Sequence, residues 1–566
     1  MKKPTTLRTM LTLTGYRRNV FLISTAFWLL LHSTPVLFGI FDRALFDSLA
    51  EGPEGGGVNP FLILLLMGLL DTGRIGLLAG GVITWSRYFI GAHLLIRRNL
   101  LGWLLTAKGA RRLNGSPSEV VTRFRDDVDD VGNYLDSFAD FPGFALFAVL
   151  ALVVMLGVDV QMTVLIMAPL GLSVLLARVL QPLIRATRRR LREATTEVTG
   201  FIGELMGAVQ AIKIAGATEG AMRHFDGLGE VRRRAALKDS LLTESFRSVS
   251  DNMVAVSTAI MLFLAADRMR EGVFTVGDMA LFMSYLPYLT GIMTFIGNML
   301  VEHRRAGVAF ERLDGVAVDA PPLELVRNRD LQLDGPLPDI VNGMPERVPL
   351  QRLDVRGLGY TFPDGTEAIS DVSFTLPRGT LTVVTGRVGS GKSTMLRALL
   401  GLLPQTTGEV LWNLQPISDR STFLVPPNAA YTAQVPRLFS DSLRENLVLG
   451  RTLGRGALDR AIDTAVMRHD IERLEEGLDT GVGNRGVKLS GGQIQRSAAA
   501  RMFVGDAELL VFDDLSSALD AQTEAELWRA LQQEDPGRTY LVVSHRPVLL
   551  ERADQVLVME AGRILT

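Results

Sequence analysis

The sequence predicts two fold classes in one chain: an all-α six-helix transmembrane domain with long cytoplasmic helical extensions, followed by an α/β P-loop NTPase domain. Two observations support this division. Long apolar runs occupy the first 300 residues, as membrane-spanning helices require. A glycine-rich loop, "GRVGSGKST" at 386–394, lies between an apolar strand pattern and a helix pattern, which is the context of a phosphate-binding loop.

Length and composition agree with this division and exclude several kinds of site. A chain of 566 residues has room for two or more domains. Lys and Arg number 59 against 61 Asp and Glu, so the net charge gives no sign of a nucleic-acid partner. Because the chain has no cysteine, disulfides, thiolate catalysis and cysteine-based metal sites are excluded.

Six membrane spans are predicted from apolar runs of about 20 residues. The fifth has the shortest apolar stretch, 253–266, and must borrow residues that precede it. The first run is long and is followed by no small-x-small cleavage site, so we interpret it as a retained helix and not as a signal peptide. The predicted spans lie at about 20–41, 61–88, 141–158, 162–182, 248–266 and 279–301.

The distribution of Lys and Arg predicts the orientation. Basic residues precede the first span and recur in the segments between spans two and three and between spans four and five. The loop at 46–60 contains acidic residues and no basic one. By the positive-inside rule, both termini and the C-terminal domain are cytoplasmic. We expect a multi-pass protein of the cell (plasma or inner) membrane.

The segments between spans two and three and between spans four and five keep a helical period, so we expect membrane helices that continue into the cytoplasm. Each has one break, near 113–121 and near 213–222, which predicts a short cross-helix at the tip of a hairpin; plain solvated loops are the alternative. The domains are therefore predicted as 1–315 and 351–566, joined by a Pro-rich and acidic linker at 316–350.

The loop at 386–394 is the predicted nucleotide site. Its glycines allow backbone N–H groups to point at phosphate oxygens, and the helix that follows adds partial positive charge. Lys392 can reach the outer phosphates, and the Ser393 hydroxyl can bind Mg²⁺. The predicted phosphate-binding residues are Gly386, Arg387, Val388, Gly389, Ser390, Gly391, Lys392, Ser393 and Thr394.

Other motifs extend this site. Asp513 ends the apolar strand "AELLVFDD" and is placed to hold Mg²⁺, and Gln434 is a further polar candidate near the ion. Tyr360 lies 26 residues before Gly386, where its ring could stack on adenine. The sequence "LSGGQIQR" can begin a helix whose N-terminus faces phosphate. Its candidate residues are Ser490, Gly491, Gly492 and Gln493, and "VVSHR" adds His545 at the end of another strand.

In this order, the motifs resemble the ATP-binding cassette (ABC) family, and six spans followed by one cassette resemble an exporter-type half-transporter. The resemblance covers nearly the whole chain. It implies an ATP-driven transporter that exports or flips an amphipathic, lipid, drug or peptide-like substrate, with ATP and Mg²⁺ as cofactors. It also implies coupling helices at the two breaks, and catalytic roles for Lys392, Gln434, Asp514 and His545.

The same resemblance implies a dimer in the lipid bilayer. Each ATP would lie between the P-loop of one chain and Ser490–Gln493 of the second half-transporter chain. Binding would close the pair and switch the membrane helices, because a ligand shifts an equilibrium through its differential affinity for two states. Hydrolysis would reset the pair. No nucleic acid is expected as a partner.

The chain departs from the family pattern at Asp514, where the family usually has glutamate to orient the attacking water. Aspartate is one methylene shorter, so its carboxylate can stop roughly 1 Å short, a displacement that costs on the order of 10²-fold in rate. Either Asp514 suffices, even if hydrolysis is slow, and the protein is a homodimer, or this chain is the weaker-site subunit of a heterodimeric exporter. We favour the homodimer, because no other cassette motif is degraded.

One further alternative is an ATP-gated, channel-like regulatory protein, which the departure at Asp514 supports. Another is an importer, although importers usually have their spans and cassette on separate chains. A soluble cassette ATPase acting on DNA or ribosomes is excluded by the six spans. Within the membrane, Asp71 and Arg74 share a helix face and form either a structural pair or a substrate contact. His32 is expected to pack and not to bind a ligand. The sequence does not identify the substrate.

Overall fold

The computed structural model describes residues 4–51, 58–107, 109, 116–333, 335, 345–362, 364–404, 406–483, 487–515 and 519–565. The chain divides into two compact units. The first comprises Met1–Gly102 and Asn114–Leu333, and the second comprises Trp103–Leu113 and Asp334–Thr566. Each unit is described by itself below.

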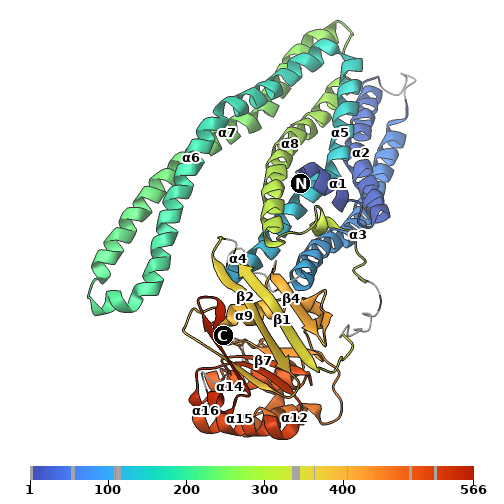
Figure 1. Ribbon diagram of the computed structural model, residues 1–566. Helices are drawn as coiled ribbons and strands as arrows, with labels where there is room; N and C mark the ends of the chain where they lie inside the picture. Colours follow the sequence, from blue (N-terminus) through green and yellow to red (C-terminus); the bar gives the residue numbers. More distant parts are fainter. Residues whose placement is uncertain are drawn as a thin grey trace. The chain divides into compact units, whose positions relative to one another are not determined.

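The first unit is helical (Figure 1). Among the described residues, five helical stretches are long and apolar enough to cross a membrane. They are α2, α3, the continuous helix formed by α4 and α5, α6, and α8. This confirms the predicted helical transmembrane domain. The helices are α1 (Thr6–Leu13), α2 (Arg18–Glu51), α3 (Pro60–Thr106), α4 (Pro117–Thr122), α5 (Val128–Val158), α6 (Val160–Ile214), α7 (Thr218–Arg270) and α8 (Val276–Val316).

The membrane helices are much longer than a bilayer requires. The 55 residues of α6 span roughly 80 Å at 1.5 Å per residue, whereas a hydrocarbon core is about 30 Å thick. The helical period that the sequence shows beyond the apolar runs therefore corresponds to continuous helix. The predicted fifth span, 248–266, lies inside α7, and its membrane insertion stays a prediction.

The tips of the long helices differ from the expected cross-helices. α6 and α7 run side by side as a hairpin (Figure 1) and are joined by three residues, 215–217, with Gly216 at φ +63°. The described residues contain no separate short helix at 213–222, so that prediction is wrong: good helix formers on both sides extend α6 and α7 up to the glycine. At the other break, 113–115 lie outside the described residues, and the six-residue α4 leads through a π-helical turn at Arg123–Asp127 into α5.

The core of the helical unit lies where α2, α5 and α8 pack together. Tyr285 is fully buried there, and its hydroxyl donates a 2.7 Å hydrogen bond to the carbonyl of Val36 beside Pro35, whose ring interrupts the α2 ladder. Gly39 leaves room for the Tyr285 ring, because a Cβ at this position would collide with it.

The first part of the predicted linker is bound to the helical unit. Asn99 of α3, 1% exposed, donates hydrogen bonds of 3.0 and 2.8 Å to the carbonyls of Leu325 and Arg327. Val348 and Leu350, at the other end of the predicted linker, pack on the second unit. The residues between them that lie outside the described part are 334, 336–340 and 341–344.

The second unit is α/β and contains two sheets (Figure 1). A four-stranded antiparallel sheet has the order β2-β1-β4-β5, and a six-stranded sheet has the order β10-β9-β3-β8-β7-β6, parallel except at β10. The strands are β1 (Arg352–Thr361), β2 (Glu367–Pro377), β3 (Leu381–Thr385), β4 (Thr407–Trp412), β5 (Gln415–Pro416), β6 (Ala429–Thr432), β7 (Leu509–Asp513), β8 (Thr539–Val543), β9 (Gln555–Glu560) and β10 (Arg563–Leu565).

Helices complete this unit around two hydrophobic clusters. Strands β3, β7 and β8 are almost fully buried, as expected of apolar runs in a parallel sheet with both faces covered. The predicted α/β class is confirmed. The helices are α9 (Lys392–Leu399), α10 (Arg420–Phe423), α11 (Leu443–Val448), α12 (Ala457–Thr464), α13 (Arg468–Glu472), α14 (Gly491–Phe503), α15 (Ala521–Glu534) and α16 (Pro547–Arg552).

Candidate nucleotide site

The candidate site is built at the carboxyl ends of four neighbouring strands, β3, β8, β7 and β6. In open α/β sheets, ligands bind outside this edge. β3 leads into the glycine-rich loop, and β8 is followed by His545. β7 ends in Asp513, and β6 is followed two residues later by Gln434. The fold therefore brings together residues that are more than 150 positions apart in the sequence.

The glycines of the loop are required by its backbone. Gly386, Gly389 and Gly391 have φ values of +142°, +85° and +99°, which L side chains rarely adopt. A Cβ on Gly386 would collide with the carbonyl of Met559, and one on Gly391 would lie 2.9 Å from the carbonyl of Ala368. The loop thus passes close to β2 and β9, and it leads directly into the N-terminus of α9.

Lys392 lies under this loop. Its Nζ donates hydrogen bonds of 2.7 and 2.8 Å to the carbonyls of Gly386 and Arg387. Burial lowers the pKa of the ammonium group, and the carboxylates of Asp513 and Asp514 oppose that shift. A cation held at this place is suited to bind the outer phosphates of a nucleotide.

Asp513 accepts hydrogen bonds from two hydroxyl groups in the site. The residue is 1% exposed; one carboxylate oxygen accepts a 2.8 Å hydrogen bond from Ser393, and the other accepts a 3.2 Å bond from Tyr431. Burial and the nearby Asp513 raise the pKa of Tyr431 to about 12, so Tyr431 stays a hydroxyl donor at neutral pH. A carboxylate beside a serine hydroxyl is the kind of oxygen donor set that Mg²⁺ prefers.

The neighbouring Asp514 differs in environment. Its backbone is left-handed, with φ +55°, and its N–H donates a 3.2 Å hydrogen bond to the carbonyl of Val543. Its carboxylate accepts a 3.3 Å hydrogen bond from the Gln434 amide. Across the same edge, Nδ1 of the exposed His545 lies 3.4 Å from Oγ1 of Thr385. These are the residues that the sequence predicts around the terminal phosphate.

Residues Ser490–Gln493 form the capped N-terminus of α14. Ser490 is the N-cap of α14, and it and Gln493 form a capping box of reciprocal 3.3 and 2.9 Å hydrogen bonds. Gln493 also donates to Asp470 at 3.3 Å. In the described part of the chain, no hydrogen bond joins Ser490–Gln493 to the loop at 386–394. The adjoining residues 484–486 and the start of "SSALD", 516–518, lie outside the described residues.

The structure does not place the Tyr360 ring on the surface. Tyr360 is 8% exposed and belongs to the core around β1, which is unsuited to stacking on a base. Phe362, two residues later, is 40% exposed and lies edge-on to Tyr360, with ring centroids 5.3 Å apart. Sequence reasoning missed Phe362, although the sequence places it between a polar threonine and a proline, a residue type that disfavours strand interiors. We therefore move the proposed adenine contact to Phe362.

The other predicted residues have distinct surroundings. Val388 is 97% exposed at the tip of the loop, Arg387 is also exposed, and Ser390 is 6% exposed. Thr394 lies in the first turn of α9. In the membrane unit, His32 stacks on Phe144 with ring centroids 4.0 Å apart, and its Nε2 lies 3.4 Å from a carboxylate oxygen of Asp140. Its role as a packing residue stays a prediction.

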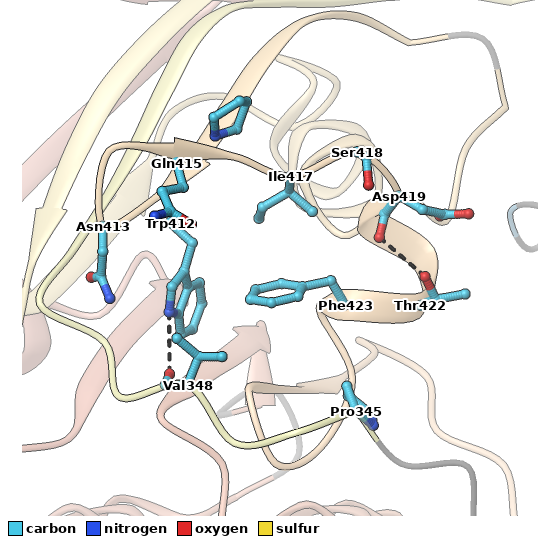
Figure 2. A pocket seen from close by; sticks show the side chains of 11 residues that line it. Pro345, Val348, Trp412, Asn413, Gln415, Ile417, Ser418, Asp419, Thr422 and Phe423 are labelled. Atoms are coloured by element: carbon cyan, nitrogen blue, oxygen red, sulfur yellow. Dashed lines mark hydrogen bonds between the residues drawn. The ribbon is translucent and has the colours of Figure 1, made fainter.

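A separate cavity of about 560 Å³ lies on the antiparallel sheet and α10. Trp412, Ile417 and Phe423 project into it, and the Trp412 indole donates a 3.1 Å hydrogen bond to the carbonyl of Val348 (Figure 2). No predicted nucleotide-site residue lines this cavity. This cavity is therefore distinct from the predicted nucleotide site.

The fold and the site together define a P-loop ATPase unit in the same chain as a helical membrane unit. Residues 21–293 match the model of the ABC transporter transmembrane region, and residues 369–517 match that of the ABC transporter. The chain belongs to the ABC transporter family. It is therefore a multi-pass membrane protein that couples ATP hydrolysis to transport.

Individual relatives agree with this assignment. The ATP-dependent lipid A-core flippase of Xanthomonas campestris pv. campestris (strain 8004) is 32% identical over 424 residues, which cover 72% of this chain and 67% of the relative. The protein of the same name from Bordetella avium (strain 197N) is 27% identical over 475 residues, with coverages of 83% and 78%. A bacterial Atm1-family ABC exporter solved with ATP bound shares the fold, with a TM-score of 0.72 at 20% identity and coverages of 96% and 94%.

Proposed function

We propose that this chain uses ATP to flip or export a lipid-like amphipathic substrate across the inner membrane. The observation that carries the proposal is the joining of two features in one chain. The predicted nucleotide-site residues gather at one sheet edge, among them Lys392, Ser393, Asp513, Gln434 and His545. The described residues of the same chain include five apolar helices of membrane-spanning length. The flippases among its relatives favour a lipid over a small polar solute.

Each site residue has a proposed role. Lys392 and the loop at 386–394 bind the phosphates, and Phe362 stacks on the base. Ser393, Asp513 and Gln434 hold Mg²⁺, which would neutralise phosphate charge. Asp514 orients the attacking water, and His545 contacts the terminal phosphate. The 3.3 Å hydrogen bond from Gln434 to Asp514 supports this arrangement, because it places the proposed water-orienting carboxylate beside a proposed Mg²⁺ ligand.

We also propose that two copies of the chain form the working transporter, with both termini and the cassettes in the cytoplasm. The exposed Ser490 at the start of α14 supports this proposal, because a helix N-terminus favours phosphate and Ser490 makes no hydrogen bond to the chain's own loop in the described residues. In a dimer it would complete the site of the second copy. A partner chain with glutamate at the position of Asp514 would be the heterodimeric alternative.

Transport in reconstituted vesicles tests the proposal. The chain would be placed in liposomes containing either lipid A-core or a fluorescent phospholipid, and leaflet exchange would be followed by quenching from outside. We expect the rate of lipid transfer with MgATP to be at least several-fold higher in the unmodified chain than in Lys392→Ala. This variant keeps the membrane unit but loses the ammonium group that is proposed to bind the phosphates. Vigorous MgATP hydrolysis without transfer of either lipid, and without stimulation by either, would contradict a lipid substrate.

A further inference from the structure

Arg546, the residue after His545, joins two loops at the phosphate edge of the sheet. One guanidinium nitrogen lies 2.8 Å from a carboxylate oxygen of Glu524 in the first turn of α15. Another donates a 3.0 Å hydrogen bond to the carbonyl of Leu519. Arg546 thus connects the chain that follows β8 to the chain that follows β7.

The Glu524 carboxylate is buried at this ion pair with Arg546. Its side chain is 9% exposed, and its second carboxylate oxygen is buried without a hydrogen-bond partner in the described part of the chain. A buried carboxylate is costly unless a cation is paired with it, so Glu524 favours a conformation in which the guanidinium is present.

The two connected loops carry the proposed catalytic groups. β7 and β8 are hydrogen-bonded neighbours up to Asp513 and Val543, and Asp514 makes one more bond to Val543. β7 ends at Asp513 and β8 ends at Val543, and among the described residues no sheet hydrogen bond joins the two chain segments farther along. Arg546 restores a link there, directly beside His545.

We propose that Glu524 and Arg546 are positioning residues that hold His545 at a fixed place relative to Leu519 and the first turn of α15. This inference rests on the proposed role of His545 at the terminal phosphate. The pair acts on the hydrolytic step and not on the binding of ATP, because neither residue belongs to the loop at 386–394 or to the base contact. A small displacement of a catalytic group is enough to slow a reaction severely.

Glu524→Gln tests the inference, because it removes the charge and keeps the size of the side chain. Its matched control is Glu508→Gln: Glu508 is equally buried, with an 11% exposed side chain, and pairs with Arg347 at 2.7 Å in the same unit. The readouts are kcat and KM for MgATP of the full chain in lipid. We expect Glu524→Gln to lower kcat at least about tenfold with KM within about twofold, and the control to leave both near wild type.

Three outcomes overturn the inference in different ways. Wild-type kcat in His545→Ala removes the proposed role of His545 and the inference with it. Loss of activity in His545→Ala together with wild-type kcat in Glu524→Gln overturns the positioning role alone. Equal losses in Glu524→Gln and Glu508→Gln assign the effect to general destabilisation.

Arg546→Lys keeps the test decisive if Glu524→Gln does not yield folded protein. A lysine ammonium keeps the charge beside Glu524 but lacks the planar fork that reaches both Glu524 and Leu519. We expect this variant to fold and to show a lowered kcat with little change in KM. A kcat equal to that of the wild type would overturn the inference.

Discussion

At the scale of single residues, two positions decide how the site works. Phe362 is exposed where Tyr360 is buried, so the ring that can stack on a base is the second aromatic of "YTF". Asp514 has a left-handed backbone, which Asp tolerates better than most residues because its short side chain can hydrogen-bond locally. Local backbone preference is thus one physical reason for aspartate at this position.

Phe362→Ala should weaken ATP binding. Stacking of an aromatic ring on a base contributes about 1–3 kcal/mol, so KM for MgATP is expected to rise about tenfold or more with a smaller change in kcat. Steady-state ATPase kinetics and binding of a fluorescent nucleotide provide the two measurements. Tyr360→Phe is the control and should leave KM near wild type, because its ring lies in the core; an unchanged KM in Phe362→Ala would show that Phe362 does not contact the base.

At the scale of elements, the sequence was sufficient for the strand-loop-helix of the phosphate site and for the apolar helices. Gly386, Lys392 and Asp513 could be assigned because their spacing and their neighbouring apolar runs reflect local structure. The hairpin tip at 215–217 and the burial of Tyr360 could not, because both depend on how far neighbouring helices extend and on packing between strands distant in sequence. The Glu524–Arg546 link has no local sequence signal.

The attachment of 323–327 to α3 is a second feature that composition did not predict, since the Pro-rich and acidic residues there indicated only a linker. Asn99 holds this segment through two carbonyls, and Glu324, 6% exposed, is paired with Arg327 and Arg329. The chain leaving the last membrane helix is therefore fixed to the helical unit before it continues toward the cassette.

Asn99→Ala should loosen this attachment. Two buried carbonyls lose their donor, which costs about 1–3 kcal/mol, and trypsin should cleave sooner at Arg327 and Arg329. Thermal unfolding in detergent and timed proteolysis are the measurements. Asn252→Ala is the matched control, because Asn252 is exposed and makes one local hydrogen bond to Ser248; equal effects of both substitutions would mean that Asn99 does not hold the segment.

At the scale of the whole molecule, a membrane unit and an ATPase unit share one chain, and the family assignment makes them parts of one transporter. A single chain has one loop at 386–394 and one Ser490–Gln493 segment, and the proposed dimer supplies each site with both. The homodimer requires that Asp514 be sufficient for hydrolysis. The activity of Asp514 therefore decides between the homodimer and the heterodimer.

The most direct test is the Mg²⁺-dependent ATPase rate of the chain purified alone in lipid, beside Asp514→Glu and Lys392→Ala. If the homodimer is the working form, the unmodified chain turns over clearly, Lys392→Ala loses the activity, and Asp514→Glu changes the rate by less than about tenfold. Negligible turnover that Asp514→Glu restores by on the order of 10²-fold would contradict it, because that is the loss expected from a misplaced carboxylate. The chain would then need a partner that carries the glutamate.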